Sequence, residues 1–196
     1  MTEPQAETHP ISLVVEDDLK RTRVTVFFRI LLAIPQAIWI SLWSIVVSVV
    51  ILISWFAALF VGRVPDGLHE FNARFLRAST HLYAYVLLLA DPWPPFLGEP
   101  ASYPVDLTVA PAAPQSRLTV FFRLVLAIPA LLFAYVFRSV NGLVAILGWF
   151  YSLATGRMHR GMRDLSAWML GFELQTYGYL MLLTGSYPSF SNGPRA

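Results

Sequence analysis

The sequence predicts an all-α integral membrane protein, in which two parallel tandem repeats of two helices each provide four transmembrane helices, with interfacial helices and short extramembrane β segments. Two observations support this prediction. Apolar residues make up 56% of the 196 positions and charged residues only 13%, whereas a typical globular chain carries about 25% charge. The apolar residues also form long blocks, such as Ile30 to Val61 without a charged residue, and a block of about 18 residues is enough for a span.

The repeat is visible directly in the sequence. The segment Arg23-Val-Thr-Val-Phe-Phe-Arg29 returns 94 residues later as Arg117-Leu-Thr-Val-Phe-Phe-Arg123. Aligned without a gap, residues 10–96 and 104–190 are identical at 29 of 87 positions, which indicates duplication of one structural unit. The chain therefore divides into a polar tail (1–9), repeat 1 (10–96), a linker (97–103), repeat 2 (104–190) and a second tail (191–196).

Each repeat opens with a short stretch, 10–15 or 104–109, whose partial alternation and β-branched residues predict a strand. The apolar run that follows in repeat 1, Phe27 to Val61, would measure roughly 52 Å as one helix, which is longer than a hydrocarbon core of about 30 Å.

Proline offers one solution, because it ends or kinks a helix. We expect Pro35 and Pro129 to mark junctions between an interfacial helix (24–34 or 118–128) and a span (about 36–61 or 130–155). A single tilted and kinked helix is the alternative. The arginines that flank the interfacial helices are expected to anchor them at the lipid headgroups: Arg23, Arg29, Arg117 and Arg123.

A second, shorter helix is expected in each repeat, over 68–90 and 162–184, which makes four spans. An even number of spans per repeat would place both copies in the same orientation, related by an axis along the membrane normal. The termini and the linker would then share one side of the membrane, and the turns at Gly62 and Gly156 the other. Residues 1–20 hold no early apolar stretch, so no cleavable signal peptide is expected, and the basic residues ahead of the first span favour cytoplasmic termini.

Repeat 1 contains four short motifs, Trp55-Phe56, Gly62-Arg63, Tyr83-x-Tyr85 and Asp91-Pro-Trp-Pro-Pro-Phe96. Together they resemble those of an uncharacterised bacterial family, number 4389 among the domains of unknown function, which is common in actinobacteria. Both halves of the chain follow the family pattern, with departures at His159 and Ser189. The resemblance implies the fold and a multi-pass location in the bacterial plasma (inner) membrane, and it implies no activity.

Signatures of enzymes and cofactor sites are absent from the sequence. There is no cysteine, which excludes disulfides and thiolate metal sites, and there is no phosphate loop and no nucleophile elbow. The four histidines have no metal-binding spacing, and a net charge of +2 without a basic face does not indicate nucleic-acid binding. We therefore expect no catalytic residue, cofactor or metal; the expected partners are the lipid bilayer and a larger membrane protein, and homo-oligomerisation is left open.

Two charged residues inside the predicted spans are the candidate functional site. Arg138 and Glu173 replace the serines of repeat 1, Ser44 and Ser79, so the two positions change together. A charge at bilayer depth costs at least about 2.5–3.5 kcal/mol unless it is paired or hydrated. Direct pairing competes with a simpler interpretation, in which Arg138 reaches the interface and Glu173 faces water or a partner chain.

These observations favour a non-catalytic accessory subunit of a larger inner-membrane complex, such as a lipid or solute transporter or a respiratory assembly. The alternative is a small transporter or channel in its own right, with its path at the repeat interface.

Overall fold

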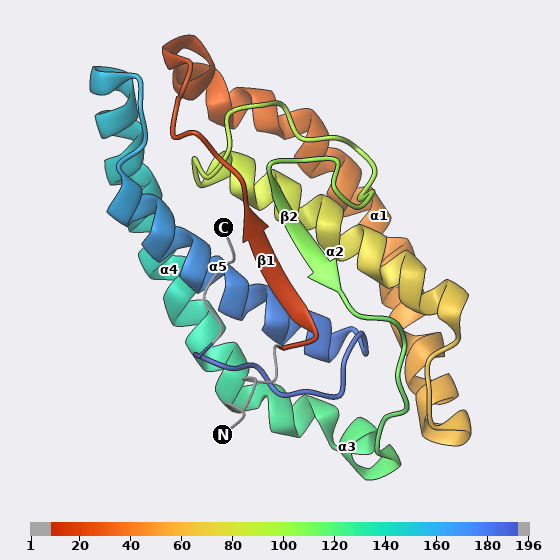
Figure 1. The fold of residues 1–196 in the computed structure, drawn as a ribbon. Helices are drawn as coiled ribbons and strands as arrows, with labels where there is room; N and C mark the ends of the chain where they lie inside the picture. The colour runs from red at the N-terminus through yellow and green to blue at the C-terminus, as the bar shows by residue number, and fades with distance from the viewer. Residues whose placement is uncertain (1–8, 192–196) are drawn as a thin grey trace, which may run out of the picture.

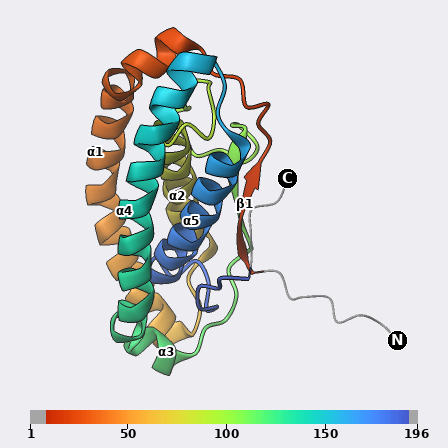
Figure 2. The same ribbon diagram turned by 90° about the vertical axis from the view of Figure 1, so that its left-hand side faces the viewer.

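The computed structural model describes residues 9–191, which form three layers (Figure 2). Two long helices make one outer layer, two shorter helices the middle layer, and a two-stranded sheet the other outer layer. In chain order the elements are β1 (Ile11–Val15), α1 (Arg23–Val61), α2 (Asp66–Val86), β2 (Val105–Val109), α3 (Arg117–Phe121), α4 (Arg123–Thr155) and α5 (Arg160–Leu180).

The outer helices α1 and α4 are the two helices, among the described residues, that are long and apolar enough to cross a membrane. Only 17% of the most apolar window of α1 and 22% of that of α4 is buried, so most of their apolar surface faces outward. The middle helices α2 and α5 are different, because twelve of the 21 residues in each are buried between the other two layers and several of these are polar. The structure thus supports two candidate spans, where the sequence predicted four.

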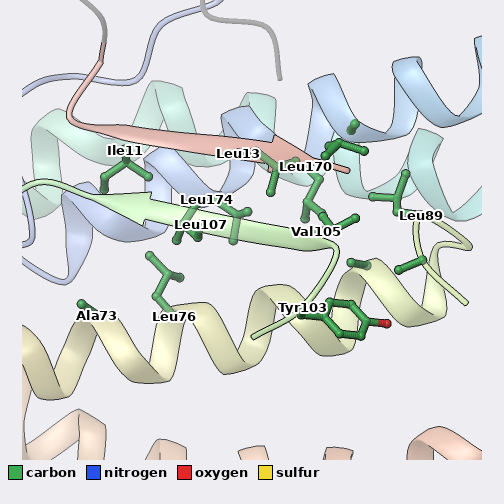
Figure 3. Packing of buried hydrophobic residues seen from close by; sticks show 14 of the residues in the cluster. Ile11, Leu13, Ala73, Leu76, Leu89, Tyr103, Val105, Leu107, Leu170 and Leu174 are labelled. Atoms are coloured by element: carbon green, nitrogen blue, oxygen red, sulfur yellow. The ribbon is translucent and has the colours of Figure 1, made fainter. Parts of the chain in front are cut away.

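The core lies between the sheet and the middle helices (Figure 3). The strands turn Leu13 and Leu107 toward Leu76 of α2 and Leu174 of α5, and all four side chains are at most 3% exposed. Burying a leucine side chain contributes about 1.5–3 kcal/mol, so the small sheet is well anchored. The two strands expected from the sequence are confirmed, and they pair antiparallel with Leu13 opposite Leu107.

The pairing of the strands reveals an approximate twofold axis. Leu13 and Leu107 are equivalent positions of the two repeats and lie directly opposite each other, so the axis passes between them. Contacts far from the sheet repeat in the same way: Trp55 Nε1 donates to the carbonyl of Val120 over 3.0 Å, and Trp149 Nε1 donates to that of Val26 over 2.8 Å. Each repeat therefore packs the segment at Val26 or Val120 against the C-terminal part of the long helix of the other repeat.

This symmetry contradicts the expected parallel arrangement of the repeats. The turn at Gly62 accepts a hydrogen bond from the backbone of Gln115 (2.8 Å), and the turn at Gly156 accepts one from Arg21 (2.9 Å). The helices α1 and α4 consequently run in opposite directions, and the two turns lie at opposite ends of the molecule (Figure 1). The physical reason is the antiparallel ribbon: pairing equivalent strands about a perpendicular twofold axis reverses every element that follows them.

The predicted helix junctions at Pro35 and Pro129 are also wrong, because α1 and α4 continue through them. The alternative of one kinked helix describes α1, whose first turns lie across the end of the layer (Figure 2). Proline removes one backbone hydrogen bond and bends the helix without ending it. In repeat 2 the interruption falls earlier, at Phe122 between α3 and α4.

The reversed repeats make a direct prediction for cross-linking. The chain has no cysteine, so cysteine pairs can be introduced at the exposed arginines without background. A short bis-maleimide should join Arg63→Cys to Arg117→Cys, since Gly62 and Gln115 are bonded. It should not join Arg63→Cys to Arg157→Cys, which are separated by most of the length of α4, roughly 50 Å for 33 residues. Efficient cross-linking between positions 63 and 157 within one chain would contradict the reversed repeats and support the parallel arrangement.

Candidate functional site

The structure brings Arg138 of α4 and Glu173 of α5 together, with Nη2 of the arginine 2.7 Å from Oε1 of the glutamate. The side chain of Glu173 is 5% exposed and that of Arg138 is 45% exposed, so the carboxylate is enclosed and the guanidinium covers it. The fold therefore shows direct pairing of the two charges, in place of an arginine that reaches the interface and a glutamate that faces water or a partner chain. The depth of the pair in a bilayer stays a prediction.

Two tyrosines from equivalent positions frame this ion pair. The phenol oxygen of Tyr83 accepts a hydrogen bond from Arg138 over 2.6 Å. The guanidinium carbon lies 5.0 Å from the ring centroid of Tyr83 and 5.8 Å from that of Tyr177, which is within range of cation–π attraction. Because these tyrosines belong to different repeats, Arg138 links the two halves close to the twofold axis.

A cavity of about 340 Å³ opens beside the pair, at the interface of the repeats. It is lined by apolar side chains of α1, α2 and α5 and by a few polar groups, which are Ser41, Ser44, Ser79, Tyr83, Arg138 and Tyr177. A cation, two phenols and three hydroxyls can bind and orient an amphiphile or hold a small polar molecule. The histidines and carboxylates of residues 9–191 form no group of three that could hold a metal.

Two of the four expected headgroup anchors are not at the surface. Arg29 and Arg123 are 1% and 2% exposed, and each lies 4.4 Å from a tyrosine ring centroid, that of Tyr85 or Tyr179. They donate to backbone carbonyls at the ends of α2 and α5. The prediction that these two arginines reach lipid headgroups is therefore wrong, because their charged groups are enclosed within the protein.

The other two expected anchors, Arg23 and Arg117, are exposed. Each lies beside the glycine turn of the opposite repeat, with Arg23 Nε 3.6 Å from the position of a Cβ on Gly156 and Arg117 Nε 3.9 Å from that on Gly62. Their contact with headgroups stays a prediction. The sequence offered a signal for the buried Arg29 and Arg123, since the Tyr83-x-Tyr85 motif recurs as Tyr177-x-Tyr179. The second tyrosine of each motif is the one that the buried arginine of the same repeat contacts.

A second polar cluster, for which the sequence pattern gave no signal, lies between α2 and the sheet. His81 is fully buried, and its Nε2 lies 2.9 Å from Oδ1 of Asp106 on β2. Burial alone would raise the pKa of the Asp106 carboxyl, but hydrogen bonds from His81 and from the backbone N–H groups of Ala101 and Leu107 outweigh it and lower the pKa. The ionised carboxylate thus holds the strand to the helix.

This cluster predicts acid sensitivity. A carboxyl whose pKa is lower in the folded state stabilises the fold above its unfolded pKa of about 4, and the stabilisation is lost as the pH falls through the folded value. Asp106→Asn should lower the unfolding free energy by about 1.5–3 kcal/mol at pH 7 and by much less at pH 3, as measured by melting in detergent. Glu99→Gln, at an exposed site near the same loop, is the control. A difference between wild type and Asp106→Asn that persists unchanged at pH 3 would contradict the assignment.

The ion pair predicts non-additive mutations. Serine at position 138 or 173 alone leaves one charge without its partner, whereas the double variant reproduces Ser44 and Ser79 of repeat 1. We expect the double variant to lose less unfolding free energy than the two single variants lose together. The difference, the coupling free energy, should be about 0.5–3 kcal/mol. Melting of the four proteins in one detergent measures this coupling, and strict additivity would mean that the observed contact contributes nothing.

The fold and this site define a protein class: a mostly helical protein of two intertwined tandem repeats with two candidate membrane-spanning helices. The chain belongs to the family described as Domain of unknown function (DUF4389), whose sequence model matches residues 23–98 and again residues 117–192. The two matches confirm both the family and the duplication predicted from the sequence. No curated protein and no solved structure matches the chain.

Proposed function

We propose that this protein is a non-catalytic accessory subunit of a larger assembly in the bacterial plasma membrane, which it crosses with α1 and α4. The proposal is supported by one observation above all, the contrast between the two outer layers. Among charged side chains, only Arg138 is exposed on α1 and α4 beyond their first residues, so this face suits lipid. The opposite layer is a short two-stranded sheet, and the loop after β1 carries the exposed charges of Asp18 and Lys20.

The twofold axis also supports a partner protein, because it fixes the depth of the sheet in the bilayer. If α1 and α4 cross the bilayer, the axis that relates them lies at mid-height, and the centre of the sheet lies on it. The sheet side exposes Thr108, and α2 carries an exposed ion pair in which Nε of Arg74 lies 3.0 Å from Oε1 of Glu70. Open strand edges and charges in contact with hydrocarbon are strongly unfavourable. A protein that covers the sheet side removes this penalty. The cytoplasmic location of both termini is part of the same proposal.

Depth measurements and partner capture test this proposal together. In nanodiscs, a nitroxide at Val46 on the outer face of α1 should lie near the bilayer centre. A tagged chain taken from native membranes should retain one stoichiometric larger partner, and Thr108→Arg should release it while the control Val46→Leu keeps it. A label at Val46 at headgroup depth, with Thr108 open to water, would show a chain lying flat on the membrane and would overturn the proposal. Retention of only a second copy of the chain would replace the partner by a homodimer.

A second candidate, a small transporter, is favoured by the cavity at Arg138. The cavity lies at the interface of repeats that run in opposite directions, an arrangement common in secondary transporters. The helices around it are continuous, whereas transporter sites usually use broken helices. Solute flux in liposomes that contain only this chain, lost in Arg138→Ser, would support transport over the accessory role.

A further inference from the structure

The twofold axis relates two buried arginine sites that differ in charge. In repeat 1, Nη2 of Arg29 lies 2.9 Å from Oδ1 of Asp91, which pairs a buried guanidinium with a carboxylate that is 25% exposed. The equivalent of Asp91 in repeat 2 is Gly185. Within residues 9–191, Arg123 forms no ion pair with a carboxylate, although it is 2% exposed. Repeat 2 therefore keeps the buried cation and lacks the anion.

The groups that hold the carboxylate in repeat 1 have counterparts in repeat 2. Asp91 accepts hydrogen bonds from the hydroxyl of Thr22 (2.8 Å), from that of Thr25 (3.4 Å) and from Arg29. The equivalent residues are Ser116, Thr119 and Arg123, which supply the same two hydroxyls and the same guanidinium. No hydrogen bond of the Ser116 or Thr119 hydroxyl to another described residue is present. The two hydroxyls thus remain without an acceptor in the described part of the chain, and Nη2 of Arg123, whose counterpart bonds the carboxylate in repeat 1, donates instead to the neutral Oε1 of Gln115.

A cavity occupies the place where the missing carboxylate would lie. Its volume is about 380 Å³, and its lining includes Ser116, Thr119, Arg123, Thr184 and Gly185. A water molecule takes about 30 Å³ in the liquid, so a carboxylate or phosphate group with its hydration fits easily. A Cβ added to Gly185 would make only ordinary contact, 3.7 Å from Cγ of Gln115. The site therefore has both the donors and the space.

The neutral groups around Arg123 do not balance its charge. The guanidinium donates to the carbonyls of Tyr179 and Thr184 and to Oε1 of Gln115. At the equivalent site of repeat 1, two arginines (Arg21 and Arg29) face two aspartates (Asp17 and Asp91), which gives a net charge of zero. In repeat 2 these four positions are Gln115, Arg123, Pro111 and Gly185, which gives +1. Burying a charge without a counter-ion is unfavourable, and arginine binds carboxylate and phosphate well.

We propose that the cavity at Arg123 binds an oxyanion, a carboxylate or phosphate group, in the place that Asp91 fills in repeat 1. Two sources share this chemistry, a small soluble anion and the phosphate of an anionic lipid headgroup. The site is separate from the Arg138–Glu173 pair and does not depend on the proposed accessory role.

The test uses the full chain in detergent and a variant that supplies the missing carboxylate. Sodium phosphate, added at constant ionic strength against sodium chloride, should raise the melting temperature of the wild type by about 2–4 °C. Gly185→Asp should melt higher than the wild type without phosphate, and phosphate should then give no further rise. Gly67→Asp, where nothing lies within 4 Å of the new Cβ, controls for an added negative charge and should keep the phosphate response. The reciprocal variant Asp91→Gly should melt lower and respond more strongly to phosphate.

Phosphatidylglycerol and phosphatidylcholine, each added to the detergent-solubilised chain, distinguish the two sources. A rise with phosphatidylglycerol that is absent with phosphatidylcholine and in Gly185→Asp identifies a headgroup, whereas a rise with free phosphate alone identifies a soluble anion. If neither anion raises the melting temperature of the wild type more than that of Gly185→Asp, Gln115 satisfies Arg123 by itself and the proposal is overturned.

Discussion

Replacing Arg29 with methionine is expected to lower the unfolding free energy by about 3–5 kcal/mol. Methionine fills much of the same space but donates no hydrogen bond, so the carbonyls of Tyr85 and Ala90 and the carboxylate of Asp91 all lose their buried donor. An unsatisfied buried acceptor costs about 1–3 kcal/mol, and the cation–π contact with Tyr85 is lost as well. Unfolding by detergent titration or thermal melting measures the loss.

Arg23→Met is the matched control, since Arg23 begins the same helix, is exposed and donates a single hydrogen bond to the carbonyl of Ala154. Its loss should be about 1 kcal/mol or less. Equal losses for the two variants would mean that Arg29 acts only through surface charge, contrary to the enclosed position described above.

Gly98→Ala is expected to be the most damaging single-methyl change, with a loss of at least about 3 kcal/mol, the upper end of the usual range for overpacking. A Cβ at this position would lie 1.8 Å from the carbonyl oxygen of Arg74 and 2.7 Å from the backbone nitrogen of Ala78. Both atoms belong to the backbone of α2, so the clash is relieved only if the loop before β2 moves away from the helix.

Gly67→Ala is the control on α2, because nothing lies within 4 Å of its added Cβ. Alanine there should leave the stability unchanged or raise it by about 0.5–1 kcal/mol. Thermal melting of both variants, together with proteolysis of the 92–100 loop, measures the difference. A mild effect of Gly98→Ala would show that this loop adapts without leaving α2.

The sequence predicted the local features of this fold better than its overall arrangement. Duplication, the two strands and the apolar character of α1 and α4 depend on patterns within one segment, and all are found. The relative orientation of the repeats depends on which strand pairs with which, and neither strand carries that information by itself. Two predicted spans in each repeat imply that the repeats are parallel, whereas the pairing of Leu13 with Leu107 requires antiparallel repeats.

The same distinction holds for the candidate site. Arg138 and Glu173 could be identified because charges are rare in apolar segments, and the simultaneous change from Ser44 and Ser79 indicated a pair. Arg29 and Arg123 were assigned to the surface, since an arginine beside an apolar helix usually reaches water. Their enclosure depends on Tyr85 and Tyr179, each 56 residues further along the chain, and such distant contacts leave only a repeated motif in the sequence.

The reciprocal contacts of Trp55 with Val120 and of Trp149 with Val26 also bear on how the two halves could have arisen and how they unfold. Neither repeat can complete its own packing, since the tryptophan near the end of each long helix bonds the segment at Val26 or Val120 of the other repeat. The halves should accordingly melt in one cooperative transition. A chain that carried a single repeat would lack the segment that its tryptophan bonds, and a second molecule would have to supply it. The present fold thus has the geometry of a symmetric dimer whose two subunits became one polypeptide.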